Sequence, residues 1–183
     1  MKRLFNTVLL TATVTLMATA AEAVQVKEVI FESQGETLVG NLYLPDDYVA
    51  GQELPGVVVT GSWTSVKEQM SGLYAENLAD RGFAALAFDF RNFGESDGDV
   101  RALESPTLKI EDIQAAAEFL PTLPEVADNQ VGGLAVCASA GYMAHAIANG
   151  APFQSFVTVA AAAAASTVQA QPTETSEPVI YNA

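Results

Sequence analysis

Hydrophobic and polar positions follow two different periods along the chain, and the change falls near residue 55. Residues 26–33 alternate apolar and polar side chains, as half-buried strands do, and residues 38–44 form a second apolar run that ends before Pro45. A short polar turn at residues 34–36 separates the two runs. This pattern predicts an antiparallel hairpin at the start of the folded region.

From residue 56 onward, short continuous apolar runs alternate with segments of helical period. Continuous apolar runs are typical of strands that are covered on both faces of a parallel sheet. Apolar residues spaced three and four apart predict helices, and Ser105-Pro106 is a typical helix start. The predicted strands are residues 56–60, 83–90, 131–136 and 156–160, and the predicted helices are residues 66–81, 105–120 and 140–149.

The order of these segments predicts the fold class. A hairpin followed by repeated strand–helix–strand units builds an α/β sheet that is mostly parallel, with helices on both faces. After residue 160 the pattern ends in an alanine run and then a segment rich in Ser, Thr, Gln and Pro. The sequence therefore divides into residues 1–23, a core at residues 24–165 and a low-complexity tail at residues 166–183, which we expect to be disordered.

The first 23 residues have the parts of a secretory signal peptide. Lys2 and Arg3 precede an uncharged apolar stretch, and residues 21–23 (AEA) have the form of a cleavage site, with residues 18–20 (ATA) as an alternative. The apolar stretch is shorter than the roughly 20 residues that a membrane-spanning helix needs, so a retained anchor is the less favoured alternative. The sequence predicts export to the bacterial periplasm or exterior, without stable membrane association after cleavage.

Composition and charge exclude several kinds of partner. The chain carries 22 acidic and 8 basic residues, a formal net charge of −14, which repels nucleic acid and anionic membranes. The single cysteine, Cys137, cannot form an intramolecular disulfide, and the single histidine, His145, cannot build a histidine-based metal site. We therefore expect no metal, no cofactor and no nucleic-acid partner, whereas the oligomeric state stays open.

Residues 137–141 (CASAG) join a predicted valine-rich strand to a predicted helix. A nucleophile at such a junction lies on a sharp turn at the helix N-terminus and needs small residues two positions away on either side. With Ser139 as the nucleophile, Cys137 and Gly141 are those small residues, and the N–H of Ala140 would help to hold an oxyanion. This arrangement predicts a serine nucleophile.

Two alternative assignments stay open at this junction. In the first, Ser139 only caps the helix that follows. In the second, Cys137 is the nucleophile, and its small neighbours are Ala135 and Ser139. The spacing to Gly141 favours the serine, in which case Cys137 ends the buried strand as a small apolar residue.

Two further motifs follow predicted strands. Residues 60–63 (TGSW) come after the first buried strand, where the N–H of Ser62 or Trp63 would complete an oxyanion hole; an ordinary glycine turn is the alternative. Residues 89–98 (DFRNFGESDG) come after the next strand. The hairpin, these two loops and the CASAG junction occur in the order found in the α/β-hydrolase superfamily, which the chain resembles over residues 26–160.

The resemblance is narrower to bacterial hydrolases grouped with dienelactone hydrolases and the Xaa-Pro dipeptidyl-peptidase-like domain. Those relatives often carry Asp-x-Arg-Gly-x-Gly-x-Ser where this chain has residues 89–96, with Asn92 in place of a glycine. In the family this segment is a structural turn, so no catalytic role follows for it. The resemblance implies acyl-enzyme chemistry on an ester, lactone, thioester or peptide, and thus a small-molecule or peptide substrate.

A serine mechanism also needs a histidine base and an acid, which in this superfamily follow the nucleophile along the chain. His145 lies about 240° around the predicted helix from Ser139, so we interpret it as a packing or surface residue. After residue 160 the sequence contains no histidine and only Glu174 and Glu177 as acids. The prediction is a truncated serine hydrolase; the alternatives are a non-catalytic small-molecule-binding descendant and an enzyme that takes its base from a partner subunit.

Overall fold

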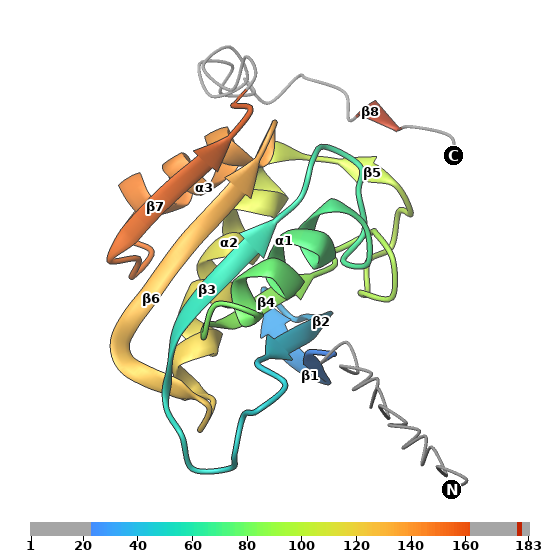
Figure 1. Ribbon diagram of the computed structural model, residues 1–183. Coiled ribbons are helices and arrows are strands. Elements are labelled where there is room, and N and C mark those ends of the chain that lie inside the picture. Colours follow the sequence, from blue (N-terminus) through green and yellow to red (C-terminus); the bar gives the residue numbers. More distant parts are fainter. Residues whose placement is uncertain (1–22, 162–178, 181–183) are drawn as a thin grey trace, which may run out of the picture.

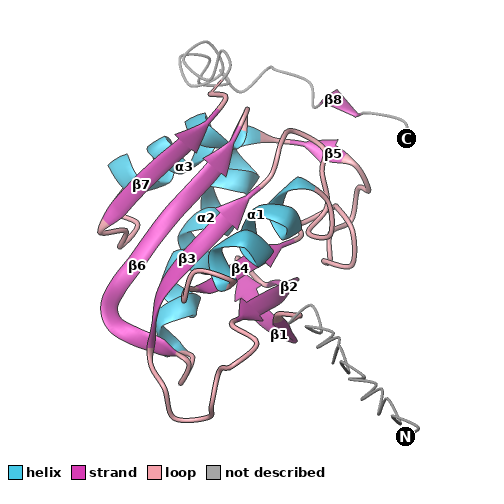
Figure 2. Cartoon of the chain, viewed as in Figure 1, coloured by secondary structure: helices cyan, strands magenta, loops and turns pink. Residues whose placement is uncertain are grey.

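The computed structural model describes residues 23–161 and 179–180, and it contains a six-stranded mixed sheet with helices on both faces (Figures 1 and 2). The strands lie in the order β1-β2-β4-β3-β6-β7 across the sheet. Strand β3 pairs in parallel with β4 and β6, and β6 pairs in parallel with β7, whereas β2 is antiparallel to both β1 and β4. The predicted fold class is therefore confirmed.

All of the predicted strands and helices are present, with boundaries shifted by a few residues. The main-sheet strands are β1 (Gln25–Ser33), β2 (Glu36–Leu44), β3 (Leu54–Thr60), β4 (Ala84–Phe88), β6 (Val126–Val136) and β7 (Ser155–Val159). The helices are α1 (Met70–Ala79), α2 (Pro106–Phe119) and α3 (Ser139–Ala148), and a 3-10 turn, Leu120–Thr122, follows α2. Strands β5 (Leu103–Glu104) and β8 (Val179–Ile180) form a separate antiparallel pair that was not predicted, because two residues carry no periodicity.

The N-terminal hairpin is closed by a two-residue turn. Gln34 and Gly35 both have positive φ, 52° and 87°, which matches the right-handed twist of the two strands. The resulting register places Phe31 opposite Leu38, and both side chains are buried. The alternation seen in the sequence therefore turns one face of the hairpin to the core.

The sheet has a separate hydrophobic core on each face. The larger core lies under α2 and α3 and includes Val58, Leu86, Ile113 and Met143, all of which are fully buried. The smaller core lies under α1, where alanines from the helix meet the opposite faces of β3 and β4. Figure 1 shows α2 and α3 on one face of the sheet and α1 on the other.

Helix α1 begins four residues later than predicted and turns its small side chains to the sheet. Its buried residues are Ser71, Gly72, Ala75 and Ala79. A Cβ atom at Gly72 would lie 2.6 Å from the carbonyl oxygen of Lys67, so the close approach of the helix requires a glycine here. Two larger apolar residues of the helix, Tyr74 and Leu78, pack against the edge of the smaller core, whereas Leu73 is exposed. Together with Leu134 of β6 these three residues line a shallow groove.

Strand β6 begins five residues earlier than predicted, because its first half is polar. Asp128, Asn129 and Gln130 are exposed within the strand, and Asn129 has a φ of 54°. The pairing with β3 is irregular between Leu54 and Gly56, at the same end of the sheet. A polar run of this kind is typical of a loop in sequence; the pairs with β3 lie on either side of it, at Leu54 with Val126 and at Gly56 with Val131, so the run forms an irregular stretch of the strand.

The predicted signal peptide, both of its cleavage sites and most of the predicted tail lie outside the described residues, so these assignments stay predictions. Within the described ranges, no helix is long and apolar enough to cross a membrane.

Candidate active site

The chain bends sharply between β6 and α3, and the bend falls at Cys137. This residue has a φ of 58°, in the left-handed region that cysteine rarely adopts. Val136 is the last residue of β6, Ala138 already has right-handed helical angles, and α3 begins at Ser139. Backbone strain of this kind at a strand–helix junction is typical of the turn that presents a nucleophile. The predicted junction is therefore present, but its bend lies two residues before the predicted position.

Ser139 does not occupy the bend. It is the first residue of α3, only 1% of it is exposed, and its hydroxyl donates a hydrogen bond to the carbonyl oxygen of Gly61 at 2.5 Å. The expectation that the backbone turns at residue 139 and presents this hydroxyl in a cleft is wrong. Ser139 also does not accept a capping hydrogen bond, because α3 has no side-chain cap.

The small residues around the bend fit the alternative register. The residues two positions before and after Cys137 are Ala135 and Ser139, and both are buried. Gly141, which was expected to be one of the two small neighbours, lies inside α3. Cys137 itself is partly exposed, and no described residue forms a hydrogen bond with its sulfur. Cys137, and not Ser139, is therefore the partly exposed residue at this junction.

At the start of α3, two amides donate turn hydrogen bonds, and the two before them donate to no acceptor in the part of the chain that the structure describes. The N–H of Ala140 donates to the carbonyl of Cys137 at 3.2 Å, and the N–H of Gly141 donates to the carbonyl of Ala138 at 3.1 Å. The predicted oxyanion donor Ala140 is thus already engaged. The amides of Ala138 and Ser139 precede these bonds, and they lie at the positive end of the helix dipole, next to Cys137.

The loop after β3 lies against the N-terminus of α3, as predicted. The hydrogen bond from Ser139 to Gly61 joins the two segments directly. Within the loop, the N–H and the hydroxyl of Ser65 donate to the carbonyl oxygen of Ser62 at 3.0 and 2.6 Å. A Cβ atom at Gly61 would lie 2.2 Å from the hydroxyl oxygen of Ser65, so a larger residue here would displace this hydroxyl from the Ser62 carbonyl. Trp63 follows with 45% of its surface exposed.

A buried cluster of Glu104, Lys109 and Tyr142 lies beside this loop. The amine of Lys109 donates to Glu104 Oε2 at 2.6 Å and to the carbonyl oxygen of Trp63, and the hydroxyl of Tyr142 donates to Glu104 Oε1 at 2.9 Å. Burial lowers the pKa of Lys109, although Glu104 and Asp112 oppose this effect. Sequence reasoning missed the cluster, because Glu104 and Lys109 cannot be told from surface charges by their spacing.

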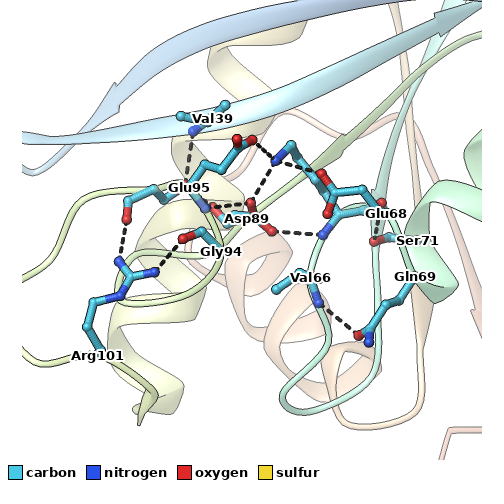
Figure 3. A network of polar contacts seen from close by, with 11 residues as sticks. Val39, Val66, Glu68, Gln69, Ser71, Asp89, Gly94, Glu95 and Arg101 are labelled. Carbon is cyan, nitrogen blue, oxygen red and sulfur yellow. Dashed lines mark hydrogen bonds and ion pairs between the residues drawn. The ribbon is translucent and has the colours of Figure 1, made fainter. Parts of the chain in front are cut away.

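The segment after β4 holds a different network, which fixes the turn itself (Figure 3). The fully buried carboxylate of Asp89 accepts hydrogen bonds from the N–H of Lys67 at 2.8 Å, the amine of Lys67 at 3.0 Å and the N–H of Glu95 at 3.0 Å. Ser96 completes the turn by donating to the carbonyl of Asp89 and accepting from the N–H of Val39. These contacts support the structural role expected for residues 89–98.

Two buried cations belong to this turn. Burial favours the neutral amine of Lys67, but the hydrogen bonds that this amine donates to Glu68, Glu95 and Asp89 outweigh burial and raise the pKa of Lys67 above its usual value. Arg91 donates from its backbone N–H and from Nε to the carboxylate of Asp112, at 3.0 and 2.7 Å. Each cation is thus paired with a carboxylate that is itself completely buried.

Comparisons with known proteins were made on both the sequence and the fold. No family model matches the chain. Over 126 residues it is 42% identical to an uncharacterised protein of Pseudomonas aeruginosa, covering 68% of this chain and 34% of that protein. It is also 34% identical over 98 residues to a thiohydrolase of Aspergillus aculeatus, covering 54% of this chain and 29% of the thiohydrolase. The chain thus spans about a third of the length of these relatives.

The solved structures agree with these relatives. The crystal structure of a hypothetical Pseudomonas aeruginosa protein superposes with a TM-score of 0.70 at 37% identity, over 81% of this chain and 48% of that one. A dienelactone hydrolase-like promiscuous phosphotriesterase from metagenomic libraries superposes with a TM-score of 0.61 at 26% identity, over 75% of this chain and 59% of that one. The chain has the α/β-hydrolase fold. The resemblance to this superfamily, and to its dienelactone hydrolase-like members, is therefore confirmed.

In this α/β-hydrolase fold, the bend at Cys137 and the loop at residues 61–65 lie at the carboxyl ends of neighbouring parallel strands, β6 and β3. His145 lies on α3, eight residues beyond Cys137, which is about 12 Å along the helix axis at 1.5 Å per residue. It is therefore not positioned as a base for Cys137. Among the described residues, no group of three His, Cys, Asp or Glu side chains could hold a metal ion.

Proposed function

We propose that this chain belongs to a hydrolase that cleaves a carbonyl ester or thioester through an acyl-enzyme on Cys137. The single observation that carries the proposal is the positive φ of Cys137 at the junction of β6 and α3. A strained residue at this place in the α/β-hydrolase fold is a candidate nucleophile, because the strain must be offset by function or by contacts elsewhere. The initially favoured nucleophile, Ser139, is buried and hydrogen-bonded to a backbone carbonyl.

The surroundings of Cys137 support a thiolate. The nucleophilic form of cysteine is the thiolate, and a helix N-terminus favours negative charge on a neighbouring sulfur. The amides of Ala138 and Ser139, which donate to no acceptor among the described residues, lie at that end of α3. Cys137 itself is partly exposed.

The proposed reaction has two steps. In the first, the Cys137 thiolate attacks the carbonyl carbon, a C–S bond forms, and the carbonyl π electrons move to the oxygen. When these electrons return, the bond to the leaving alkoxide or thiolate breaks, and the leaving group takes a proton from solvent water. In the second, water attacks the enzyme thioester and the C–S bond breaks; the carboxylic acid leaves, and the thiol of Cys137 returns a proton to solvent to restore the thiolate.

The oxyanion of both steps would be held by two backbone donors. With Cys137 as the nucleophile, the residue after it is Ala138, and the second donor comes from Ser62 or Trp63 in the loop after β3. The hydrogen bond between Ser139 and Gly61 supports this pairing, because it holds the loop against the start of α3. Ser139 then contributes by positioning the loop, and not as a nucleophile.

The names of relatives support the substrate class. A thiohydrolase of Aspergillus aculeatus and a thiohydrolase of Eupenicillium brefeldianum are 34% and 35% identical to this chain over their matched regions. A polyketide transferase of Penicillium crustosum is 32% identical over 115 residues. These names favour a thioester or activated ester as the substrate of this chain.

Rapid-mixing kinetics with 4-nitrophenyl acetate test the proposal on the full chain and on two matched variants, Cys137→Ala and Ser139→Ala. We expect a stoichiometric burst of 4-nitrophenolate from the full chain and none from Cys137→Ala. Ser139→Ala should keep the stoichiometry of the burst but reach it more slowly, and should lose about 1–2 kcal/mol of stability, because the carbonyl of Gly61 loses its donor. A burst that persists in Cys137→Ala and disappears in Ser139→Ala would restore the serine assignment. No burst in any of the three would favour a non-catalytic small-molecule-binding protein.

A further inference from the structure

Three consecutive carbonyl groups of the loop after β3 are each held by a hydrogen bond. Gly61 accepts from Ser139 of α3, Ser62 accepts from Ser65 within the loop, and Trp63 accepts from Lys109 of α2. A trans peptide unit is planar, and its C=O and N–H groups point in opposite directions. Holding these three carbonyls therefore orients the N–H groups of the residues that follow them, at positions 62, 63 and 64.

Lys109 is the buried charge among these anchors. Its side chain is 2% exposed, and it is enclosed by the rings of Phe90 and Phe93, whose centroids lie 4.8 and 4.5 Å from the amine. Glu104 and Tyr142, which complete the cluster, are 7% and 1% exposed. Two of the three elements that supply the cluster, α2 and α3, belong to the packed core, so the amine is placed by rigid parts of the fold.

Stability alone does not account for this cluster. Taking an amine and a carboxylate out of water is costly, and well-packed apolar residues in their place are often equally stable or more so. Burial accordingly lowers the pKa of Lys109 despite the nearby carboxylate of Glu104. Outside the cluster, Lys109 donates a hydrogen bond to the carbonyl oxygen of Trp63. Trp63 lies in the loop at the carboxyl end of β3, next to the end of β6 that carries Cys137. Apolar residues in place of the cluster could fill the same space but could not donate this hydrogen bond to Trp63.

We infer that Lys109 is a positioning residue, which fixes the loop at residues 62–64 so that its N–H groups point at the oxyanion formed on a Cys137-bound substrate. Glu104 orients the amine, and Tyr142 links Glu104 to α3, the helix that begins beside Cys137. Lys109 does not touch the reacting atoms in this role. The inference rests on the proposed function, because it needs an oxyanion at Cys137.

Two reactions of the same sulfur separate positioning from a general effect on the fold. Acylation by 4-nitrophenyl acetate passes through an oxyanion, whereas alkylation by iodoacetamide displaces iodide at a saturated carbon and forms none. The double variant Glu104→Gln/Lys109→Met removes both buried charges together, so neither is left unpaired. Lys27→Met is the matched control, because it breaks another lysine–glutamate pair, with Glu125, at a half-exposed lysine on β1.

We expect the double variant to be acylated about 10- to 100-fold more slowly, since misplaced oxyanion donors lose most of their effect. Its alkylation should stay within about twofold of the unaltered chain, and Lys27→Met should change neither rate. Tyr142→Phe keeps both charges and gives a second test, with a smaller loss of acylation and unchanged alkylation. Equal slowing of both reactions, or unchanged acylation in a folded double variant, would overturn the inference. An unaltered chain that is alkylated but never acylated would overturn the proposed function as well.

Discussion

The turns after β4 and after β6 each contain a residue with positive φ whose backbone polar groups are both paired, but only at the first does the side chain also form a hydrogen bond within the described residues. At Asn92, with a φ of 72°, the side-chain carbonyl accepts from the N–H of Val100, and the backbone groups pair with Asp97 and Ala102. At Cys137, with a φ of 58°, the backbone groups pair with Val159 and Ala140, but no described residue bonds to the sulfur. Asparagine is also among the residues that tolerate this conformation best, whereas cysteine is not.

The surroundings of the two turns differ in the same way. The turn after β4 is closed around Asp89, Lys67 and Ser96, and its hydrogen-bonding groups face one another (Figure 3). The turn after β6 leaves Cys137 partly exposed beside the first amides of α3, which donate to no acceptor within residues 23–161. The positive φ of Asn92 thus completes a hydrogen-bond network in the turn after β4. In the turn after β6, the positive φ of Cys137 accompanies a thiol that no described residue binds. Only the second arrangement is expected of a chemical site.

Lys67→Met, at the turn after β4, is expected to cause the largest loss of stability among the variants that test this comparison. The substitution leaves the buried carboxylate of Asp89 with two backbone N–H donors and no cation, which should lower the free energy of unfolding by about 3 kcal/mol. Denaturant titration measures the loss, and alkylation of Cys137 in the folded variant should be unchanged. A comparable loss of alkylation would show that the two turns are not independent.

The same variant has a defined pH dependence. Because the pKa of Lys67 is raised above 10.5 in the folded chain, its contribution to stability is complete below that value and is lost only as the pH rises through the folded pKa. The difference in unfolding free energy between the unaltered chain and Lys67→Met should therefore be constant from about pH 7 to pH 9. A difference that already shrinks in this range would contradict the raised pKa.

Replacing each positive-φ residue by glycine should change the free energy of unfolding by a smaller amount. The change is expected to have opposite signs for Asn92→Gly and Cys137→Gly. Asn92→Gly relieves little strain and removes the acceptor of the Val100 N–H, so it should destabilise by about 1 kcal/mol. Cys137→Gly relieves strain and removes no hydrogen bond, so it should stabilise by up to about 1 kcal/mol while abolishing acylation. Thermal and denaturant unfolding of the pair measure both signs, and destabilisation by Cys137→Gly would mean that the sulfur is needed for packing.

Sequence periodicity was sufficient to predict the sheet and the helices, but not the residue at which the chain bends. The hairpin at residues 26–44 and the helix after Ser105-Pro106 follow from alternation and from a helix start that both act locally. The bend at Cys137 instead depends on where β6 stops pairing with its neighbours, and the N–H of Cys137 still donates to Val159 of β7 at 3.0 Å. The local sequence at residues 137–141 does not indicate this long-range contact.

The candidate site was predicted in part for a similar reason. The loop at residues 60–63 and the junction at 137–141 were both expected at the ends of parallel strands, and the structure brings them together through Ser139 and Gly61. The residue at the bend was not predicted, because small residues at alternate positions fit two registers and the spacing to Gly141 favours the one centred on Ser139, whereas the positive φ lies at Cys137. The Lys109 cluster had no signal in the sequence, since its members come from three separate elements.

The central claim is that the reactive group at this junction is the sulfur of residue 137. Its most direct test is to treat the full chain with 4-nitrophenyl acetate, digest it, and locate the acetyl group by fragmenting the peptide that contains residues 137–141. We predict acetyl on Cys137 as a thioester that hydroxylamine removes at neutral pH. Acetyl on Ser139, in an ester that survives this treatment, would contradict the account.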